Sequence, residues 1–294
     1  MSTVRFGADG GTTPALAAEH ALHAELSTLL GAPVEVLPEV GSTNQELAER
    51  AREAAVRGGG LPDLSLLATD YQSAGRGRLD RSWVVAPGEA LTFSLLLRPS
   101  GPSGAPLATQ TFGWLTMLLS TAVAQALSLQ GIAAQVKWPN DVLVGDRKMV
   151  GVLASLVPFD HLPPAVVVGA GINVSTTELP VHTATSVLRE GGDPNRGELL
   201  RQVVQCFLPL YRSFCADPTQ LAQPHGSLRH DVEALLGTLG RRVRAQLPGN
   251  QPPLVGVAAG LDQYGALLLD DDAGARHHLS AADVVHLRGA QEDV

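Results

Sequence analysis

Apolar residues recur along this chain at two different spacings, one typical of helices and the other typical of strands. Positions three or four apart predict helices over residues 13–31, 43–58, 108–129, 196–214 and 219–236. The helix over 108–129 has no charged residue in its interior, so we expect it to lie buried beneath a sheet. Thr43 and Glu46 have the spacing of a capping box at the start of the second helix.

The strand-like segments are shorter and are bounded by turn residues. Apolar runs of this kind predict strands over residues 34–37, 64–69, 142–144, 147–153 and 166–174. Leu91–Leu97 alternates apolar and polar positions, which indicates a sheet covered on one face, and with Trp83–Val85 it predicts a hairpin. Pro139-Asn140-Asp141 is a turn signal, so the segments around it are expected to pair across a tight bend.

From Gly240 onward the chain consists of short strand-like runs separated by turns. They cover residues 241–247, 254–261, 266–269, 276–279 and 284–288. Strands of this length and spacing indicate a small β-barrel of about fifty residues, attached as a second domain.

Composition narrows the class of protein. The chain has 294 residues, of which 45% are hydrophobic and 17% charged, so it is expected to fold into one large or two unequal domains. Its formal charge of -8 argues against a general nucleic-acid binder. Cys206 and Cys215 lack metal-ligand or disulfide-framework spacing, which favours reduced thiols. We find no signal-peptide core and no apolar run of membrane-spanning length, and therefore expect a soluble cytoplasmic protein.

Asp70–Trp83 carries the most suggestive chemistry. It reads DYQSAGRGRLDRSW and packs Gly75-Arg76-Gly77-Arg78 and then Arg81 into a few residues of an acidic chain. Glycines let a backbone approach a ligand closely, and arginines offer planar, permanently charged forks to phosphate or carboxylate. This stretch predicts an anion-binding loop, and a solvated basic turn is the alternative.

Other motifs are ambiguous when taken singly. Ser42-Thr43-Asn44 either caps a helix or holds a polar ligand at the helix N-terminus. Lys148 begins an apolar strand, where a lysine usually points to solvent, and Asp141 either caps a turn or takes part in chemistry. Val166–Val174, VVVGAGINV, has no third small residue at Val174, so we reject a dinucleotide-binding fingerprint. The sequence also lacks a Walker A motif and a G-x-S-x-G nucleophile elbow.

Taken in order, several motifs resemble those of biotin–protein ligases, the enzymes that attach biotin to a lysine of a carrier protein. They are Gly41-Ser42-Thr43-Asn44, Gln72 with Gly75–Trp83, Lys137-Trp138-Pro139-Asn140-Asp141, Arg147-Lys148 to Gly151, Gly169 to Asn173, and Ala184-Thr185-Ser186. Their order and separations are similar to the family's from about Val34 through the C-terminal strands. Each motif is weak alone, whereas the ordered set is specific.

The resemblance implies an α+β fold. Its main part is a mixed, mostly antiparallel sheet flanked by helices, the class II synthetase-like biotin/lipoate ligase fold, followed by an SH3-like β-barrel. The corresponding division is an N-terminal extension with one helix over 1–33, a catalytic domain over 34–237 and a barrel domain over 238–294. Residues 1–33 are too few for a DNA-reading domain, so the chain resembles the ligase-only class, acting as a monomer or homodimer.

The implied chemistry has two steps. ATP activates the biotin carboxylate as biotinyl-5′-AMP with release of pyrophosphate, and a lysine of a biotin carboxyl carrier domain then attacks the mixed anhydride. Mg²⁺ is expected to bridge the phosphates, mostly through phosphate oxygens and water, so no protein ligand to the metal is identified. Neither DNA nor a membrane is an expected partner.

The resemblance also implies roles for individual residues of this chain. The implied catalytic residues are Lys148, Arg78 and Asp141, the last orienting or deprotonating the carrier lysine. The implied biotin-binding positions are Ser42, Thr43, Asn44, Gln72, Gly75, Arg76, Gly77, Arg78, Lys148 and Gly151. The implied ATP-binding positions are Arg78, Arg81, Trp83, Lys148 and Asn173.

One residue departs from the family pattern, and two other functions stay open. Asp80 stands before the last arginine of the loop, where the family often has glycine or asparagine, and its carboxylate is expected to weaken the pull of Arg78 and Arg81 on phosphate. A lipoate or octanoate ligase is the enzymatic alternative, although Gln72 suits a ureido ring better than a fatty chain. A biotin-responsive transcriptional repressor is the alternative from another class.

Overall fold

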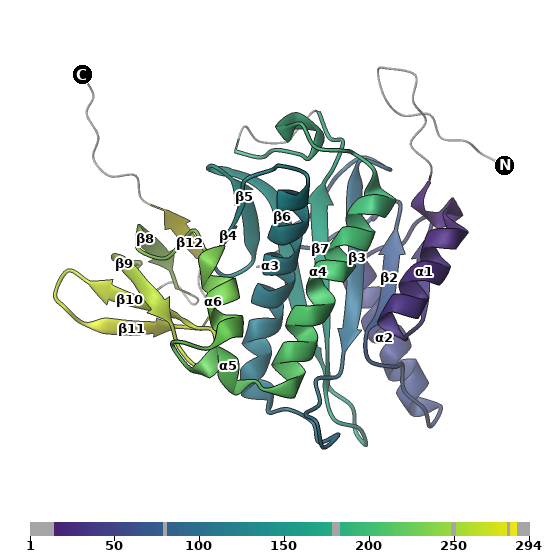
Figure 1. The fold of residues 1–294 in the computed structure, drawn as a ribbon, viewed down its shortest axis with the longest axis horizontal. Coiled ribbons are helices and arrows are strands. Elements are labelled where there is room, and N and C mark those ends of the chain that lie inside the picture. The colour runs from purple at the N-terminus through teal and green to yellow at the C-terminus, as the bar shows by residue number, and fades with distance from the viewer. Residues whose placement is uncertain (1–14, 79–80, 178–182, 248–250, 281–282, 287–294) are drawn as a thin grey trace.

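The computed structural model describes residues 15–78, 81–177, 183–247, 251–280 and 283–286 (Figure 1). Its main sheet has seven strands in the order β1-β2-β3-β7-β6-β5-β4. The strands are β1 (Val34–Leu37), β2 (Ser65–Thr69), β3 (Ala90–Leu97), β4 (Ala134–Lys137), β5 (Asp141–Val144), β6 (Arg147–Val157) and β7 (Ala165–Asn173). β1 and β2 are parallel, and the other neighbours are antiparallel. The predicted mixed, mostly antiparallel sheet is therefore confirmed.

Helices cover both faces of this sheet (Figure 1). One face carries α1 (His20–Leu30), α3 (Gly113–Leu129), α4 (Arg196–Ala216), α5 (Thr219–Ala222) and α6 (Ser227–Ala234). The opposite face carries α2 (Thr43–Val56), whose Leu47, Ala48 and Ala51 pack against β2, β3 and β7. Three 3₁₀ turns complete the described helices: η1 (Leu16–Ala18), η3 (Thr109–Phe112) and η4 (Leu188–Glu190).

The predicted hairpin over 83–97 is wrong. β3 pairs with β2 on one side and β7 on the other, so it is a central strand, and residues 83–85 lie in a loop. All eight residues of β3 are buried, including Thr92 and Ser94. The alternation that indicated a half-covered sheet instead places small hydroxyls on the α2 face, where they meet other polar groups.

Three helical predictions also need correction. The first helix begins at His20, because residues 16–18 form a separate 3₁₀ turn; its end at the left-handed Gly31 is as expected, and residues 13 and 14 lie outside the described residues. The N-cap of α2 is Ser42, and its side chain makes no capping hydrogen bond, while Glu46 pairs with Arg50 one turn later. The capping box is therefore absent from this helix. The segment 219–236 forms two short helices, because the chain turns through residues 223–226.

Residues Thr109–Leu129 form the one described helical segment that is long and apolar enough to cross a membrane, with a mean hydropathy of 1.4. The expectation that no apolar run reaches that length is thus wrong. In this fold 72% of the segment's apolar 18-residue window is buried, and α3 packs between α4 and the sheet. Its apolar character is that of a core helix, as its charge-free interior predicts.

The C-terminal strands form a second, five-stranded antiparallel sheet in the order β11-β10-β9-β8-β12. They are β8 (Arg242–Gln246), β9 (Leu254–Leu261), β10 (Leu267–Asp271), β11 (Arg276–Leu279) and β12 (Asp283–His286), and all five were predicted. Two buried indoles join this sheet to the main body. Trp114 Nε1 donates to the Gln263 carbonyl at 3.0 Å, and Trp138 Nε1 donates to the Gly265 carbonyl at 3.0 Å.

The junction between the two sheets makes stability depend on pH. Burial, with Lys137 and Arg241 nearby, lowers the pKa of His286 from 6.5 to about 4, and Nε2 lies 3.1 Å from Thr238 Oγ1. Between these two pH values the unfolded chain binds the proton and the folded chain does not, so stability is lost as the pH falls from 6.5 toward 4. We expect denaturant unfolding midpoints to fall less over this window in His286→Gln than in the parent chain.

The matched control is His225→Gln, which removes an exposed histidine from the segment between α5 and α6. Its unfolding midpoints should follow the parent curve. An unchanged pH slope in His286→Gln, with the control also unchanged, would mean that His286 does not contribute this effect.

Candidate active site

A cleft of about 880 Å³, open to solvent, lies where the start of α2 and the loop after β2 meet the α2 face of β3, β6 and β7. Sequence reasoning named twelve of its lining residues: Ser42, Thr43, Asn44, Gln72, Arg76, Gly77, Arg78, Arg81, Trp83, Asp141, Lys148 and Gly151. Residues separated by up to 109 positions therefore meet in one place. The predicted site is largely brought together by the fold.

Glycines make the floor of this cleft. Gly151 in β6 and Gly171 in β7 lie under the indole of Trp83, and a Cβ at Gly171 would stand 2.8 Å from a ring carbon. The indole N–H of Trp83 is buried and has no hydrogen-bond partner within the described part of the chain. The indole of Trp83 thus lies directly on the glycine floor, which only residues without a Cβ permit.

One end of the cleft is polar and neutral. Gln72 Oε1 accepts hydrogen bonds from the backbone N–H of Thr43 at 2.8 Å and from its hydroxyl at 3.1 Å. Ser94 Oγ donates to Asn44 Oδ1 at 2.6 Å, and Asn44 Nδ2 donates to the Leu153 carbonyl at 3.0 Å. Ser94 was not predicted for this site, although a serine within an apolar strand was the available signal. This end presents fixed amide and hydroxyl groups.

The other end carries charge. Lys148 Nζ lies 2.7 Å from Asp141 Oδ1, and Arg78 Nη1 donates to Asn140 Oδ1 at 3.0 Å. Asn140 in turn donates to the Val152 carbonyl at 2.9 Å and accepts from the Val152 N–H at 2.8 Å. Sequence reasoning treated Asn140 only as part of a turn and of a motif. In the fold its amide joins Arg78 to strand β6.

Both backbone polar groups of Lys148 are bonded to the segment 183–185, which runs parallel to the start of β6. The Lys148 N–H donates to the Thr183 carbonyl and its carbonyl accepts from the Thr185 N–H, both at 2.8 Å. The buried Asn173 donates from Nδ2 to the Thr185 carbonyl at 3.0 Å. These contacts give the Ala184-Thr185-Ser186 motif a structural role, because they fix the start of β6 from which the lysine side chain projects.

Two predicted site residues do not line the cleft. Asn173 is buried, and its side chain is directed to the 183–185 segment. Gly75 lies inside the loop, where a Cβ would come within 2.4 Å of the Trp83 carbonyl oxygen. The need for glycine at this position is thus explained by contact between two parts of one loop. Asp80 lies outside the described residues.

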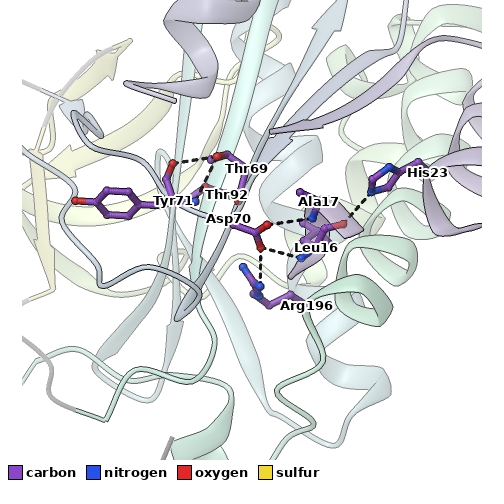
Figure 2. Close-up of polar contacts among 8 residues, drawn as sticks. All are labelled: Leu16, Ala17, His23, Thr69, Asp70, Tyr71, Thr92 and Arg196. Atoms are coloured by element: carbon purple, nitrogen blue, oxygen red, sulfur yellow. Dashed lines mark hydrogen bonds and ion pairs between the residues drawn. The ribbon is translucent and has the colours of Figure 1, made fainter. Parts of the chain in front are cut away.

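The loop is anchored at its start by the Asp70 carboxylate (Figure 2). It accepts hydrogen bonds from the N–H groups of Leu16 at 2.8 Å and Ala17 at 3.0 Å, and it pairs with Arg196 at 2.7 Å. Arg196 is the first residue of α4, and its side chain is only 4% exposed. Asp70 therefore ties η1 and α4 to the strand end from which Gln72 and the arginines follow.

The histidine pairs offer no metal site. His20 and His23 lie edge to face, and His277 and His278 contact different carboxylates, those of Asp271 and Asp262. Across the residues that the structure describes, no group of three or more His, Cys, Asp or Glu side chains gathers as metal ligands would. Cys206 and Cys215 are free thiols, as expected.

Comparison with known proteins decides the family. The model of the "Biotin/lipoate A/B protein ligase family" matches residues 39–173, and that of the "Biotin protein ligase C terminal domain" matches residues 238–287. The chain is also 33% identical over 261 residues to the biotin--[acetyl-CoA-carboxylase] ligase of Mycobacterium tuberculosis, covering 87% of this chain and 89% of that protein. The chain belongs to the biotin/lipoate protein ligase family.

Other members of the family extend the match. The bifunctional ligase/repressor BirA of Escherichia coli is 30% identical over 84% of this chain and 72% of its own length. A structure of the biotin protein ligase from Aquifex aeolicus in complex with biotin and ATP superposes with a TM-score of 0.67 at 26% identity, covering 87% of this chain and 99% of that one. Family membership, which the ordered motifs indicated, is thereby confirmed.

Proposed function

We propose that this chain is an ATP-dependent biotin–protein ligase, which forms biotinyl-5′-AMP and transfers biotin to a specific lysine of a biotin carboxyl carrier domain. The observation that carries the proposal is the polarity of this cleft. A neutral end formed by Gln72, Thr43 and Asn44 faces a charged end formed by Arg78 and Lys148. Biotin has the same two ends, a neutral ureido ring and a carboxylate.

The ureido ring needs both donors and acceptors, because it offers one carbonyl oxygen and two N–H groups. The neutral end supplies hydroxyls and side-chain amides whose positions are set by the contacts of Gln72 with Thr43 and of Ser94 with Asn44. Groups fixed before binding lose less conformational freedom on binding. Lipoate lacks a ureido group, so it would leave these groups without partners.

Adenylation brings two anions together, since the biotin carboxylate attacks the α-phosphate of ATP. Such an approach is unfavourable unless cations neutralise both partners in a site shielded from water. Lys148 and Arg78 project into the same end of the cleft, and Arg76 and Arg81 lie along it. We assign the stabilisation of the transferring phosphoryl centre chiefly to Lys148 and Arg78.

The nucleotide base is assigned to the outer face of the Trp83 indole, whose other face lies on Gly151 and Gly171. Asn173, whose amide donates to the Thr185 carbonyl, stays the predicted hydrogen-bonding partner of the base. Mg²⁺ would be held by the phosphates and water, because the carboxylate that reaches the cleft from the described residues, Asp141, is paired with Lys148. When bound, the ion would draw charge from the phosphate oxygens.

Transfer requires a neutral amine at the acyl carbon. Asp141 is proposed to orient the carrier lysine or to accept its proton, a role for which it must first leave Lys148.

The proposal also places the enzyme in the cytoplasm, where its carrier would be found, and assigns it no DNA partner. Its state as a monomer or homodimer stays a prediction.

Biotin-dependent exchange between ATP and labelled pyrophosphate tests the first step, and label transfer to a purified carrier domain tests the second. We expect exchange with biotin and none with lipoate or octanoate. Exchange supported by lipoate but not by biotin would replace the proposal with the enzymatic alternative. Tight, salt-sensitive binding to a palindromic DNA site would add the repressor function that the BirA relatives carry in their names.

A further inference from the structure

Lys148 lies where β6 departs from regular pairing with both of its neighbours in the sheet. Toward β5 the register shifts beside the lysine, because Val142 faces Val150 while the next residue of β5 faces Lys148. Toward β7 the pairing of β6 begins only at Val150, two residues farther along the strand. An irregularity of this kind changes the direction in which a strand presents its side chains. The placement of the ammonium therefore depends on what else holds the backbone of the lysine.

The segment 183–185 pairs with Lys148 where β7 does not. It runs parallel to the start of β6 with Ala184 opposite the lysine, and both backbone polar groups of Lys148 bond to it at 2.8 Å. Such a short segment can hold the lysine in place only if it is itself fixed by the rest of the protein.

A largely buried carboxylate fixes this segment. Thr185 is fully buried, and its hydroxyl donates to Oε1 of Glu190 in η4. The Glu190 side chain is only 12% exposed, and its oxygens lie 2.9 and 3.1 Å from Nη2 of Arg147. The backbone N–H of Glu190 donates to the Ser186 carbonyl at 3.1 Å. The carboxylate is thus tied to the segment by its side chain and by its own backbone.

These contacts close a ring around the lysine. Arg147 precedes Lys148 in β6, Glu190 joins the Arg147 guanidinium to the Thr185 hydroxyl, and the Thr185 N–H bonds to the Lys148 carbonyl. Among the described residues that line the ligand cleft, Lys148 is the one member of this ring. An effect of Glu190 on chemistry in the cleft would therefore pass through Lys148.

We propose that Glu190 is a positioning residue for adenylation, which fixes Thr185 and thereby sets where the Lys148 ammonium stands. The inference rests on the proposed function and deepens it by naming the support of its principal cation. A cation stabilises the transferring phosphoryl centre only if it is already in place, and a displacement of about 1 Å can cost on the order of a hundredfold in rate. Because Arg147 pairs with the carboxylate, this support adds no net negative charge beside the ammonium.

Removing either partner of the bond between Thr185 and Glu190 tests the proposal. Thr185→Val keeps the size of the side chain without its hydroxyl, and Glu190→Ala removes the acceptor. We expect each variant to lower kcat for biotin-dependent ATP–pyrophosphate exchange by about tenfold to a hundredfold, per biotin-binding site counted by calorimetric titration. Thr185→Ser keeps the hydroxyl and should recover most of the rate. Glu53→Ala is the matched control, since it breaks an exposed glutamate–arginine pair on α2, and it should exchange as the parent does.

A Lys148→Ala background separates positioning of the ammonium from a general loss of structure. If Glu190 acts through the ammonium, Thr185→Val has nothing left to position once the ammonium is gone. We therefore expect the double variant to exchange within about twofold of Lys148→Ala alone, because residues that act as one unit are not additive. Loss of structure would instead add its full effect in both backgrounds.

Parent-level exchange by both Thr185→Val and Glu190→Ala would overturn the inference. A further loss in the double variant as large as the loss that Thr185→Val causes alone would also overturn it, and so would a comparable loss in Glu53→Ala. Absence of biotin-dependent exchange in the parent chain is a different failure, because it would remove the proposed function itself.

Discussion

Replacing Lys148 with alanine is expected to slow biotin-dependent ATP–pyrophosphate exchange by about a hundred- to a thousandfold, the usual cost of losing one group that stabilises transition-state charge. The ammonium stands at the charged end of the cleft, 2.7 Å from Asp141, and the N–H and carbonyl of Lys148 are both bonded to residues 183–185. Loss of the side chain removes a positioned cation and leaves the Asp141 carboxylate unpaired where two further anions must bind. Steady-state exchange at saturating biotin and ATP measures the effect.

Two further variants make this result specific. Lys148→Arg keeps the charge but replaces a point charge with a larger planar fork, so we expect only partial recovery of the exchange rate. Arg57→Ala removes a cation whose side chain is 73% exposed at the end of α2, and it should exchange at the parent rate. Parent-level exchange by a folded Lys148→Ala protein would remove Lys148 from the proposed catalytic role.

A single methyl group at Gly169 is expected to weaken biotin binding by about tenfold to a hundredfold, the range for leaving buried polar groups without partners. A Cβ there would stand 2.2 Å from Asn44 Oδ1, 2.7 Å from Ser94 Oγ and 3.0 Å from the Phe93 carbonyl oxygen. The last is backbone of a central strand and cannot yield, so the two side chains must move. Their displacement breaks the hydrogen bond that fixes the neutral end of the cleft.

Calorimetric titration of Gly169→Ala with biotin measures this effect directly. Gly59→Ala is the matched control, since its Cβ would meet no atom closer than 3.8 Å and it lies outside the cleft. The control should bind biotin as the parent does. Parent-like biotin affinity in Gly169→Ala would show that the hydrogen bond between Ser94 and Asn44 does not support biotin binding.

The segment Leu91–Leu97 shows why sequence reasoning predicted a strand correctly but missed the role of Ser94 within it. The alternation in this segment correctly predicts a strand, because the two-residue period of side chains is a local property of extended backbone. It does not reveal what covers each face. Ser94 is buried because Asn44, 50 positions earlier, brings polar atoms to it, and a local pattern carries no information about such a partner.

Asn140 illustrates the same limit within the site. Its place in a Pro-Asn-Asp turn is readable from the sequence, but its contact with Arg78 joins residues 62 positions apart. Gly75 shows the same limit. The resemblance implied that it contacts biotin, whereas in the fold a glycine is needed because the Trp83 backbone approaches it closely. Where a residue type suits two roles, only its neighbours in the fold show which role it has.

The sequence by itself determined most strands and helices, the five-stranded C-terminal module, the family, and the Asp70–Trp83 stretch as part of the candidate site. These follow from local periodicity and from motifs whose order is preserved along the chain. The tertiary structure alone decided that β3 is central, that Ser94 positions Asn44, and that Asn140 lines the cleft. Pairing between distant segments sets all three, because burial and hydrogen bonding depend on which surfaces meet.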